Sequence, residues 1–352
     1  MSQRSLLHYS ACFAFLTALV SCVQTPGPYQ GAGSAAVPLP MATPFIREFQ
    51  IYNKNLYNPF DVIFDRQGNL WFNAEGYNYL GMMTTHHKIH AYRLKKQRNN
   101  YGVDYAYRFA LGPDGNVWFT DYYGETLGTI KGTRIYQYGP PKGYYAWTAG
   151  LVSYGRNIWV VTLGSLYGEL DKFSTKAKLL KRIRLTGYYC YPDPIIVDKH
   201  GAFWIGNSAN CPKITRVTQN GTVTDFPIKA SSGVWALTYG PDGNVWFAAA
   251  DGYTTYVGKM TPDGVVSRYP TPSLADSMAI GPDGNWWITL PFYGQIITMD
   301  LRGQLLGMYT IPRARKHSSS YQLAQIILGP DGNMWFGEGN RRTIGELVFP
   351  GK

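Results

Sequence analysis

The chain is poor in charge and in the residues that catalytic and metal sites most often use. Only 16% of its 352 residues are charged, and it contains 6 His and 4 Cys. Their spacing forms no Ser-His-Asp constellation, no glycine-rich phosphate loop and no Cys-His pair. Helical periodicity is almost absent, and the apolar stretch at 11–20 is too short for an ordinary membrane span. These absences exclude a helical fold and leave no function that a local motif alone identifies.

A short phrase is instead repeated along the chain. It reads GPDGNVWF at 112–119 and 240–247, GPDGNWWI at 281–288 and GPDGNMWF at 329–336, with weaker copies at 65–72, 154–161 and 198–205. The copies recur every 41 to 48 residues and align the tryptophans Trp71, Trp118, Trp159, Trp204, Trp246, Trp287 and Trp335. A period of this size in strand-like sequence is typical of a β-propeller blade.

One repeat contains the four strands of such a blade. Its Pro and Asp favour a type I turn, and the Gly that follows takes the left-handed position of a hairpin loop. In the unit at 277–309 this turn joins an apolar strand to the strand at 286–289, and two further strands follow. Because one blade cannot bury both faces, blades stack in a ring, with the repeated Trp between neighbours. The sequence predicts an all-β, seven-bladed β-propeller of four-stranded antiparallel blades over 45–352.

The last unit lacks an outer strand. After Trp335 the chain has room for only three strands, whereas the segment 45–51 resembles the fourth strands of other units, such as 222–228. We expect 45–51 to complete the last blade and to close the ring as one cooperative unit.

The first 44 residues are expected to precede the fold. Residues 1–22 are typical of a targeting segment, and their end, LVSC, resembles a bacterial lipobox with Cys22 as the lipidated residue. A plain secretion signal is the alternative. Residues 23–44 are rich in Pro, Gly and Ala and predict a tether. We therefore expect an exported, monomeric lipoprotein of the bacterial cell envelope that contacts the membrane through its lipid anchor only.

Two cysteines and one basic segment remain to be explained. Cys190 and Cys211 fall at the same end of the fourth blade, and export favours a disulfide between them. With only these two sulfurs and no matching His, zinc is not expected. Much of the net charge of +11 lies at 172–184. This segment reads as a solvated blade edge protected from edge-to-edge pairing, or as a surface with affinity for an anionic envelope. Nucleic-acid binding is not expected without a recognisable motif.

A ligand-binding face is predicted at one end of the ring. Loops that follow the Trp strand and loops that lead into each first strand emerge there, and most of the 28 tyrosines fall in them. Tyr offers a large contact area and a hydrogen-bonding tip, although some of these rings are expected only to pack loops together. The ligand-binding candidates are Tyr107, Tyr122, Tyr123, Tyr145, Tyr189, Trp235, Tyr253 and Tyr293.

Oxygen-bearing side chains are expected near the central channel. Asp121, Asn207 and Glu338 each follow a repeated Trp by three residues, and Asp193 and Asp276 lie at a corresponding depth on first strands. Convergence of these groups would provide oxygen ligands for Mg²⁺ or Ca²⁺. A polar channel filled by water is the alternative.

The repeat also resembles a known family. GPDGNVWF, followed by Gly-x-Ile/Val-Gly-x-Ile/Val patterns at 124–130 and 339–347, is similar to the streptogramin B lyases, also called virginiamycin B lyases. The resemblance covers about 45–350. It implies a propeller that opens a cyclic depsipeptide by elimination across its ester bond, with a divalent metal, normally Mg²⁺. Such chemistry needs a base that removes a proton α to a carbonyl and a cation or acid that stabilises the developing charge.

The residues that this resemblance would make catalytic are only partly present. The family places a His at the start of the first strand in each of its last two blades. Here Asp276 stands at the first position, or Met278 in a second alignment, and Ala324 stands at the other. Gln322 replaces an expected Glu, and only Glu338 keeps its identity.

Without an imidazole base, the sequence favours binding over catalysis. We expect the Tyr-rich loop face to bind an extracytoplasmic ligand, which is a small molecule, a peptide, a glycan such as a cell-wall fragment, or another envelope component. The alternative is a metal-dependent lyase or lactonase that uses Glu338 and Asp276 as catalytic residues. A third hypothesis is a scaffold that contacts a partner through the edge of the ring.

Overall fold

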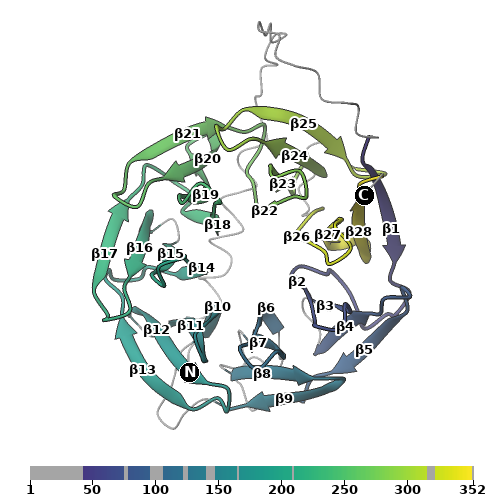
Figure 1. Cartoon of the computed structure of the whole chain (residues 1–352), viewed down its shortest axis with the longest axis horizontal. Coiled ribbons are helices and arrows are strands. Elements are labelled where there is room, and N and C mark those ends of the chain that lie inside the picture. The colour runs from purple at the N-terminus through teal and green to yellow at the C-terminus, as the bar shows by residue number, and fades with distance from the viewer. Residues whose placement is uncertain are drawn as a thin grey trace, which may run out of the picture.

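The computed structural model describes residues 43–74, 78–95, 106–121, 126–139, 147–164, 166–207, 210–314 and 322–350. These residues form seven four-stranded antiparallel sheets, arranged as the blades of a ring (Figure 1). The predicted fold class is therefore confirmed. No helix in this part of the chain has the length and hydropathy that a membrane span requires. The expected signal segment, with Cys22, and nearly all of the expected tether lie outside the described residues.

The blades follow one another in chain order, and the strands of each run from the axis outward (Figure 1). Blade 1 contains β2 (Val62–Phe64), β3 (Leu70–Asn73), β4 (Tyr79–Met83) and β5 (Ile89–Arg93), and blade 2 contains β6 (Ala106–Leu111), β7 (Val117–Asp121), β8 (Thr126–Lys131) and β9 (Arg134–Tyr138). Blade 3 contains β10 (Trp147–Tyr154), β11 (Asn157–Leu163), β12 (Gly168–Ser174) and β13 (Leu179–Arg184), and blade 4 contains β14 (Pro192–Val197), β15 (Phe203–Asn207), β16 (Lys213–Val217) and β17 (Val223–Pro227). Blade 5 contains β18 (Val234–Tyr239), β19 (Val245–Asp251), β20 (Thr254–Met260) and β21 (Val266–Pro270), and blade 6 contains β22 (Ser277–Ile280), β23 (Trp286–Leu290), β24 (Gln295–Met299) and β25 (Leu305–Thr310). Blade 7 contains β26 (Ile326–Leu328), β27 (Met334–Glu338), β28 (Thr343–Val348) and β1 (Phe45–Gln50), with the 3₁₀ turn η1 (Gly339–Arg341) between β27 and β28.

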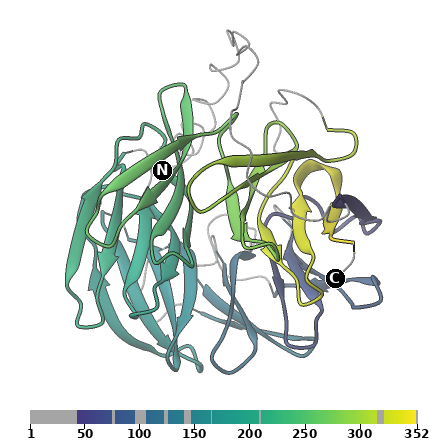
Figure 2. The ribbon, with the colours of Figure 1, turned by 45° about the horizontal axis from the view of Figure 1, so that its top comes forward.

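The ring is closed by the N-terminal strand, as the sequence predicted. β1 pairs antiparallel with β28, from Phe45 opposite Val348 to Gln50 opposite Thr343. The closure is visible in Figure 2, where the dark purple strand lies beside the yellow strands of the last blade. Arg47 forms an ion pair with Glu346 across this pair of strands at 3.3 Å. Both ends of the described chain thus belong to one blade.

The repeated turn fixes each Trp through its aspartate. The turn glycines have φ between 62° and 83° in all seven copies, as the hairpin loop requires. In six blades the indole N–H of the Trp donates to the turn Asp, at 2.9–3.1 Å: Trp71 to Asp65, Trp118 to Asp114, Trp204 to Asp198, Trp246 to Asp242, Trp287 to Asp283 and Trp335 to Asp331. The third copy has Arg156 in its turn instead, and Trp159 Nε1 has no hydrogen-bond partner among the described residues.

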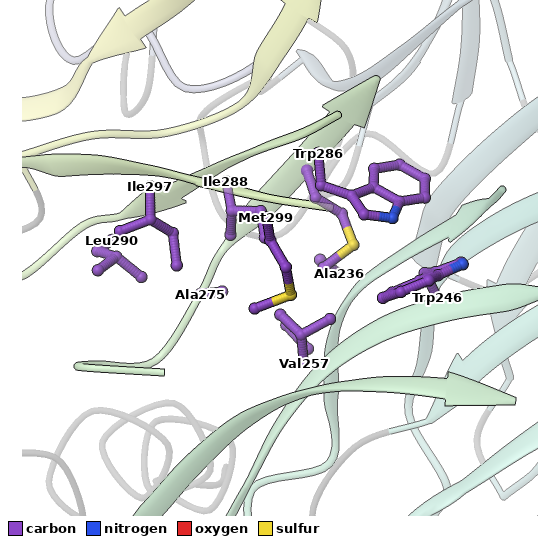
Figure 3. Close-up of a cluster of buried hydrophobic side chains, with 11 residues drawn as sticks. Ala236, Trp246, Val257, Ala275, Trp286, Ile288, Leu290, Ile297 and Met299 are labelled. Carbon is purple, nitrogen blue, oxygen red and sulfur yellow. The ribbon is translucent and has the colours of Figure 1, made fainter. Parts of the chain in front are cut away.

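The hydrophobic core is divided among the interfaces between blades. Seven clusters of buried side chains are present in the described residues, and each contains the Trp of one blade packed against the next. Figure 3 shows the cluster between blades 5 and 6, where the rings of Trp246 and Trp286 lie 5.4 Å apart near Val257 and Met299. The predicted position of the Trp between blades is therefore confirmed. A lone blade would expose these surfaces, so we expect the ring to fold as one unit.

Candidate functional site at the channel mouth

The innermost strands of four consecutive blades are interrupted near their starts. Strand pairing shifts between Ala106 and Phe109 in β6, Thr148 and Leu151 in β10, Pro192 and Ile195 in β14, and Val234 and Ala236 in β18. Such a bulge bends a strand and re-aims the side chains that it carries. The bulges present Tyr107, Arg108, Asp193 and Trp235 at the end of the ring where the predicted ligand-binding loops emerge. We call this end of the central channel the channel mouth.

Charged side chains from three blades meet there. The Tyr107 phenol donates a 2.6 Å hydrogen bond to Oδ2 of Asp193, and the Arg108 guanidinium donates to the same oxygen at 3.0 Å. Arg108 also lies 3.8 Å from Oδ1 of Asp61, which directly precedes β2. Gly150 of blade 3 lets the backbone at Asp193 of blade 4 approach closely, because a Cβ at Gly150 would collide with the carbonyl oxygen of Asp193. We refer to Asp61, Tyr107, Arg108 and Asp193 as the channel-mouth group.

Asp61 is the buried member of this group. Its side chain is 1% exposed, and its Oδ2 accepts a 2.7 Å hydrogen bond from the N–H of Phe109 in blade 2. Burial raises the pKa of Asp61 to about 7, against the opposing effects of Arg108 and of the Phe109 hydrogen bond. Nearby charges on Asp193 and Asp276 raise the pKa further. Asp61 therefore changes its charge near neutral pH.

Arg108 carries the opposite charge at the mouth. Burial tends to lower the pKa of its guanidinium, but Asp193, Tyr107 and Asp61 together hold the pKa above its ordinary value. The guanidinium also lies over the rings of Tyr107 and Phe60, at 4.7 and 5.4 Å from their centroids. A fixed cation thus faces carboxylates from blades 1 and 4.

Two polar atoms at the mouth remain available to a ligand. Within the described residues, neither Oδ1 of Asp193 nor Nε1 of Trp235 has a hydrogen-bond partner, although both atoms are shielded from water. An unsatisfied buried polar atom costs free energy, which a ligand with a matching donor or acceptor would recover. The mouth therefore combines one acceptor, one donor and two aromatic side chains in a prearranged setting.

The other predicted ligand-binding residues occupy different settings. Tyr189 and Tyr253 are 46% and 86% exposed, in loops that lead into blade 4 and join β19 to β20. Tyr293 packs partly against the cluster between blades 5 and 6. Tyr122, Tyr123 and Tyr145 lie outside the described residues. Of the candidates within the described residues, Tyr107 and Trp235 are the two placed at the bulges of the channel mouth.

The predicted disulfide is present. Cys190 and Cys211 are bonded, with their Cα atoms 5.2 Å apart. The bond ties the loop before β14 to the loop after β15 and so holds the start of the strand that carries Asp193.

Glu338, the residue that matches the family in identity, lies in a separate buried site at the end of β27. Its side chain is 0% exposed, and its Oε2 lies 3.2 Å from Nη1 of Arg341 in the turn that follows. The same guanidinium lies 3.3 Å from Oε1 of Glu48 on the closing strand β1. Burial raises the pKa of Glu338 well above its usual range, and the charge of Glu48 raises it further.

This donor set does not fit the divalent metal that the resemblance implied. Arg341 already supplies a positive charge to Glu338 and Glu48, and Arg313 adds a second nearby cation. Gln322 donates its side-chain amide to the carbonyl oxygen of Phe292, and Ala324 offers no ligand atom. Among the described residues, no group of three or more His, Cys, Asp or Glu side chains is arranged to hold a metal ion.

The remaining metal and catalytic candidates have separate surroundings. The Asn207 amide donates within its own blade, to the carbonyl oxygens of Ile205 and Lys213 and to Thr215. Asp121 is buried at the end of β7, where its carbonyl oxygen accepts from Thr148. Asp276, just before β22, affects the channel mouth through its charge on Asp61. Met278, the second alignment choice, is a buried core residue.

Sequence reasoning missed two members of the channel-mouth group. Asp61 begins blade 1 much as Asp193 and Asp276 begin theirs, and this shared position was the available signal. Arg108 directly follows Tyr107, but no local pattern indicates that its partner lies 85 residues away.

Comparisons with known proteins agree with this architecture. Two curated virginiamycin B lyases, from Bordetella parapertussis and Bordetella bronchiseptica, are each 39% identical to the chain over 51 residues, which is 14% of this chain and 16% of each relative. The match thus spans about a sixth of their length.

Solved structures match over a longer range. A catalytically inactive virginiamycin B lyase from Staphylococcus aureus with quinupristin superposes with a TM-score of 0.74 at 21% identity, covering 87% of this chain and 99% of that one. A streptogramin B lyase structure gives a TM-score of 0.73 at 19% identity, covering 87% and 97%. At these identities the superpositions support the fold alone.

A family-level match covers more than half of the chain. Residues 138–352 match the description of the virginiamycin B lyase family, from the end of blade 2 through blade 7. This range includes Glu338 as well as the positions occupied by Asp276, Gln322 and Ala324. On this match and the propeller architecture, the chain belongs to the virginiamycin B lyase family.

Proposed function

We propose that this chain is an exported, lipid-anchored binding protein that holds an extracytoplasmic peptide, glycan or envelope component at the channel mouth and its Tyr-rich loops. The observation that carries the proposal is the channel-mouth group, in which Tyr107 and Arg108 fix one oxygen of Asp193 while the other has no partner among the described residues. Rigid, partly desolvated polar groups beside aromatic rings are typical of ligand sites.

Binding is favoured over elimination because no candidate base among the described residues is placed to act on a substrate. Ala324 and Asp276 occupy the positions that the resemblance assigned to imidazoles. Asp61 has a pKa near neutrality, but its side chain is 1% exposed, so it is not placed to touch a substrate. Glu338 is 0% exposed and is paired with Arg341.

Family membership favours one alternative function, the lyase. Because a relative was crystallised with quinupristin, that compound belongs in any test of this chain. The experiment incubates the purified mature chain with quinupristin, peptides and cell-wall fragments and identifies retained or converted species by mass spectrometry. We expect at least one species to be retained unchanged, with weaker retention by Asp193→Asn and by Trp235→Phe.

The matched control is Tyr136→Phe, a change in an exposed tyrosine on the outer strand β9. Retention that is equal in the wild type and the two channel-mouth variants would overturn the assignment of the site. Conversion of quinupristin by the wild type, lost in Glu338→Gln, would establish the lyase instead.

A further inference from the structure

Three tyrosines, two of them exposed and one partly buried, form a group beside the disulfide, outside the channel-mouth group. Tyr167 lies between β11 and β12, and Tyr188 and Tyr189 lie between β13 and β14. The ring of Tyr188 contacts both others edge-on, with centroids 5.3 Å from Tyr167 and 4.7 Å from Tyr189. We call Tyr167, Tyr188 and Tyr189 the tyrosine platform.

The platform is exposed to an extent that packing alone does not explain. Tyr188 and Tyr189 are 53% and 46% exposed, and Leu166 beside them is 36% exposed. Contiguous aromatic and apolar side chains on a surface frequently mark a site of interaction. Rings that served only to pack loops together would be turned inward, as Tyr293 partly is.

The backbone under the platform is held rigidly. Cys190, adjacent to Tyr189, is bonded to Cys211, and the N–H of Tyr189 donates to the carbonyl oxygen of Leu166 at 3.1 Å. Tyr189 has a φ of 55°, a left-handed conformation that is uncommon for such a bulky residue. Strained backbone of this kind persists where surrounding contacts enforce it, and it is frequent at ligand sites.

A cation accompanies the rings. The guanidinium of Arg184, the last residue of β13, lies 3.4 Å from the centroid of the Tyr167 ring. Arg184 is exposed and forms no salt bridge within the part of the chain that the structure describes. Arg182, by contrast, is paired with Glu169 and Asp171 at 3.0 Å. The Glu169 carboxylate lies opposite Arg184 across β12 and β13 and interacts with its charge, but it is bonded to Arg182 at 3.0 Å. Arg184 therefore keeps an exposed guanidinium that no carboxylate of the described residues approaches within salt-bridge distance.

We propose that the tyrosine platform is a binding site for an acidic polysaccharide. The C–H faces of sugar rings stack on the exposed faces of Tyr188 and Tyr189, and a uronic carboxylate pairs with Arg184. The inference rests on the proposed function, because it names the class of envelope glycan and locates it beside the channel mouth rather than in it. Charge complementarity favours an acidic over a neutral glycan.

The test is isothermal titration of the purified mature chain with oligogalacturonate, with malto-oligosaccharide as the uncharged probe. We expect oligogalacturonate to bind and malto-oligosaccharide to bind at least about tenfold more weakly. The double variant Tyr188→Ala/Tyr189→Ala is expected to lose at least about tenfold in affinity, and Arg184→Gln to lose most of the salt-sensitive part. The matched control is Tyr136→Ala, because Lys131 lies over that exposed ring at 5.5 Å in a comparable pairing of Tyr with a cation.

Each other outcome overturns the inference. Absence of oligogalacturonate binding, or unchanged binding by the double variant with an unchanged unfolding temperature, excludes the platform as the site. Binding of phosphatidylglycerol vesicles without binding of the sugar assigns the surface to lipid. Loss of sugar binding in Asp193→Asn but not in the double variant places the glycan at the channel mouth, which overturns the platform and leaves the proposed function standing.

Discussion

Tyr107 of blade 2 and Asp193 of blade 4 are joined by a 2.6 Å hydrogen bond, although blade 3 separates their blades in the ring. Contacts between neighbouring blades hold a propeller together, but this bond crosses the channel mouth between blades that are not neighbours. It exists because both residues lie at bulges that turn their side chains out of the regular sheet. The bond therefore serves the geometry of the mouth more than the packing of the ring.

Replacing Tyr107 by Phe removes the donor to Asp193 and keeps the ring. Because Asp193 retains Arg108 as a partner and is partly exposed, we expect a loss of about 1 kcal/mol in the free energy of unfolding. Calorimetry of Tyr107→Phe beside Tyr136→Phe measures this difference. Equal stability of the two variants would show that the bond contributes nothing in solution.

The raised pKa of Asp61 predicts that the free energy of unfolding depends on pH. Its pKa is about 7 in the folded chain, above the value of 3.8 for an unperturbed carboxyl. Folding therefore favours the protonated form of Asp61. The contribution of this carboxyl to the free energy of unfolding is fully present below pH 4 and is lost as the pH rises towards 7. The shift in pKa corresponds to a loss of roughly 4 kcal/mol in the free energy of unfolding.

Asp61→Asn removes this titration and keeps an oxygen that can accept from the Phe109 N–H. We expect the stability of the variant relative to the wild type to rise between about pH 4 and pH 7 and to level off above. Urea unfolding at a series of pH values measures this difference. A constant difference over that range would contradict the raised pKa of Asp61.

The sequence predicted the ring well because the residues within each repeat determine the turn and strands of one blade. The turn glycine, the Trp and the strand between them are fixed within a few residues, so blade number and register follow from local chemistry. Phe45–Gln50 was recognisable as the missing strand for the same reason. The role of Asp283 as acceptor for Trp287 was also within reach, since the two are separated by four residues in the turn motif.

The channel mouth was less predictable because it depends on how the ring curves. Arg108 and Asp193 belong to bulges whose position no turn motif marks, and they meet only when three blades are assembled. Glu338 was identified from its match to the family, but its partner Glu48 comes from the closing strand, near the other end of the chain. Long-range pairs of this kind are set by topology rather than by local sequence.

The third blade offers a natural control for the Trp-Asp bond. Trp287 donates to Asp283, whereas Trp159 has no acceptor for its indole N–H among the described residues and has Lys172 over its ring at 5.3 Å. We expect Trp287→Phe to destabilise the chain by about 1 kcal/mol more than Trp159→Phe, because only the former removes a hydrogen bond, the one from the indole N–H to Asp283. Urea unfolding of both variants measures the difference. An equal loss would mean that ring volume alone sets the cost.

The pairing of Arg341 with two carboxylates predicts how the stability of the chain responds to divalent metal. Because its guanidinium pairs with both Glu338 and Glu48, we expect neither Mg²⁺ nor a chelator to change the unfolding temperature of the wild type. Arg341→Gln leaves the buried Glu338 and the partly exposed Glu48 without this cation. Since Arg341 is only 19% exposed, we expect a loss of about 3 kcal/mol, partly recovered on addition of Mg²⁺.

The matched control is Arg342→Gln, the adjacent residue, whose guanidinium lies over Tyr57 instead. Thermal unfolding of all three proteins with Mg²⁺ and with chelator gives the comparison. A wild type that is stabilised by Mg²⁺ would show that a metal competes successfully with Arg341 for the carboxylates. In that case Glu338 and Glu48 would bind the cation that the lyase hypothesis requires. The positions of Ala324 and Asp276 would still lack an imidazole base.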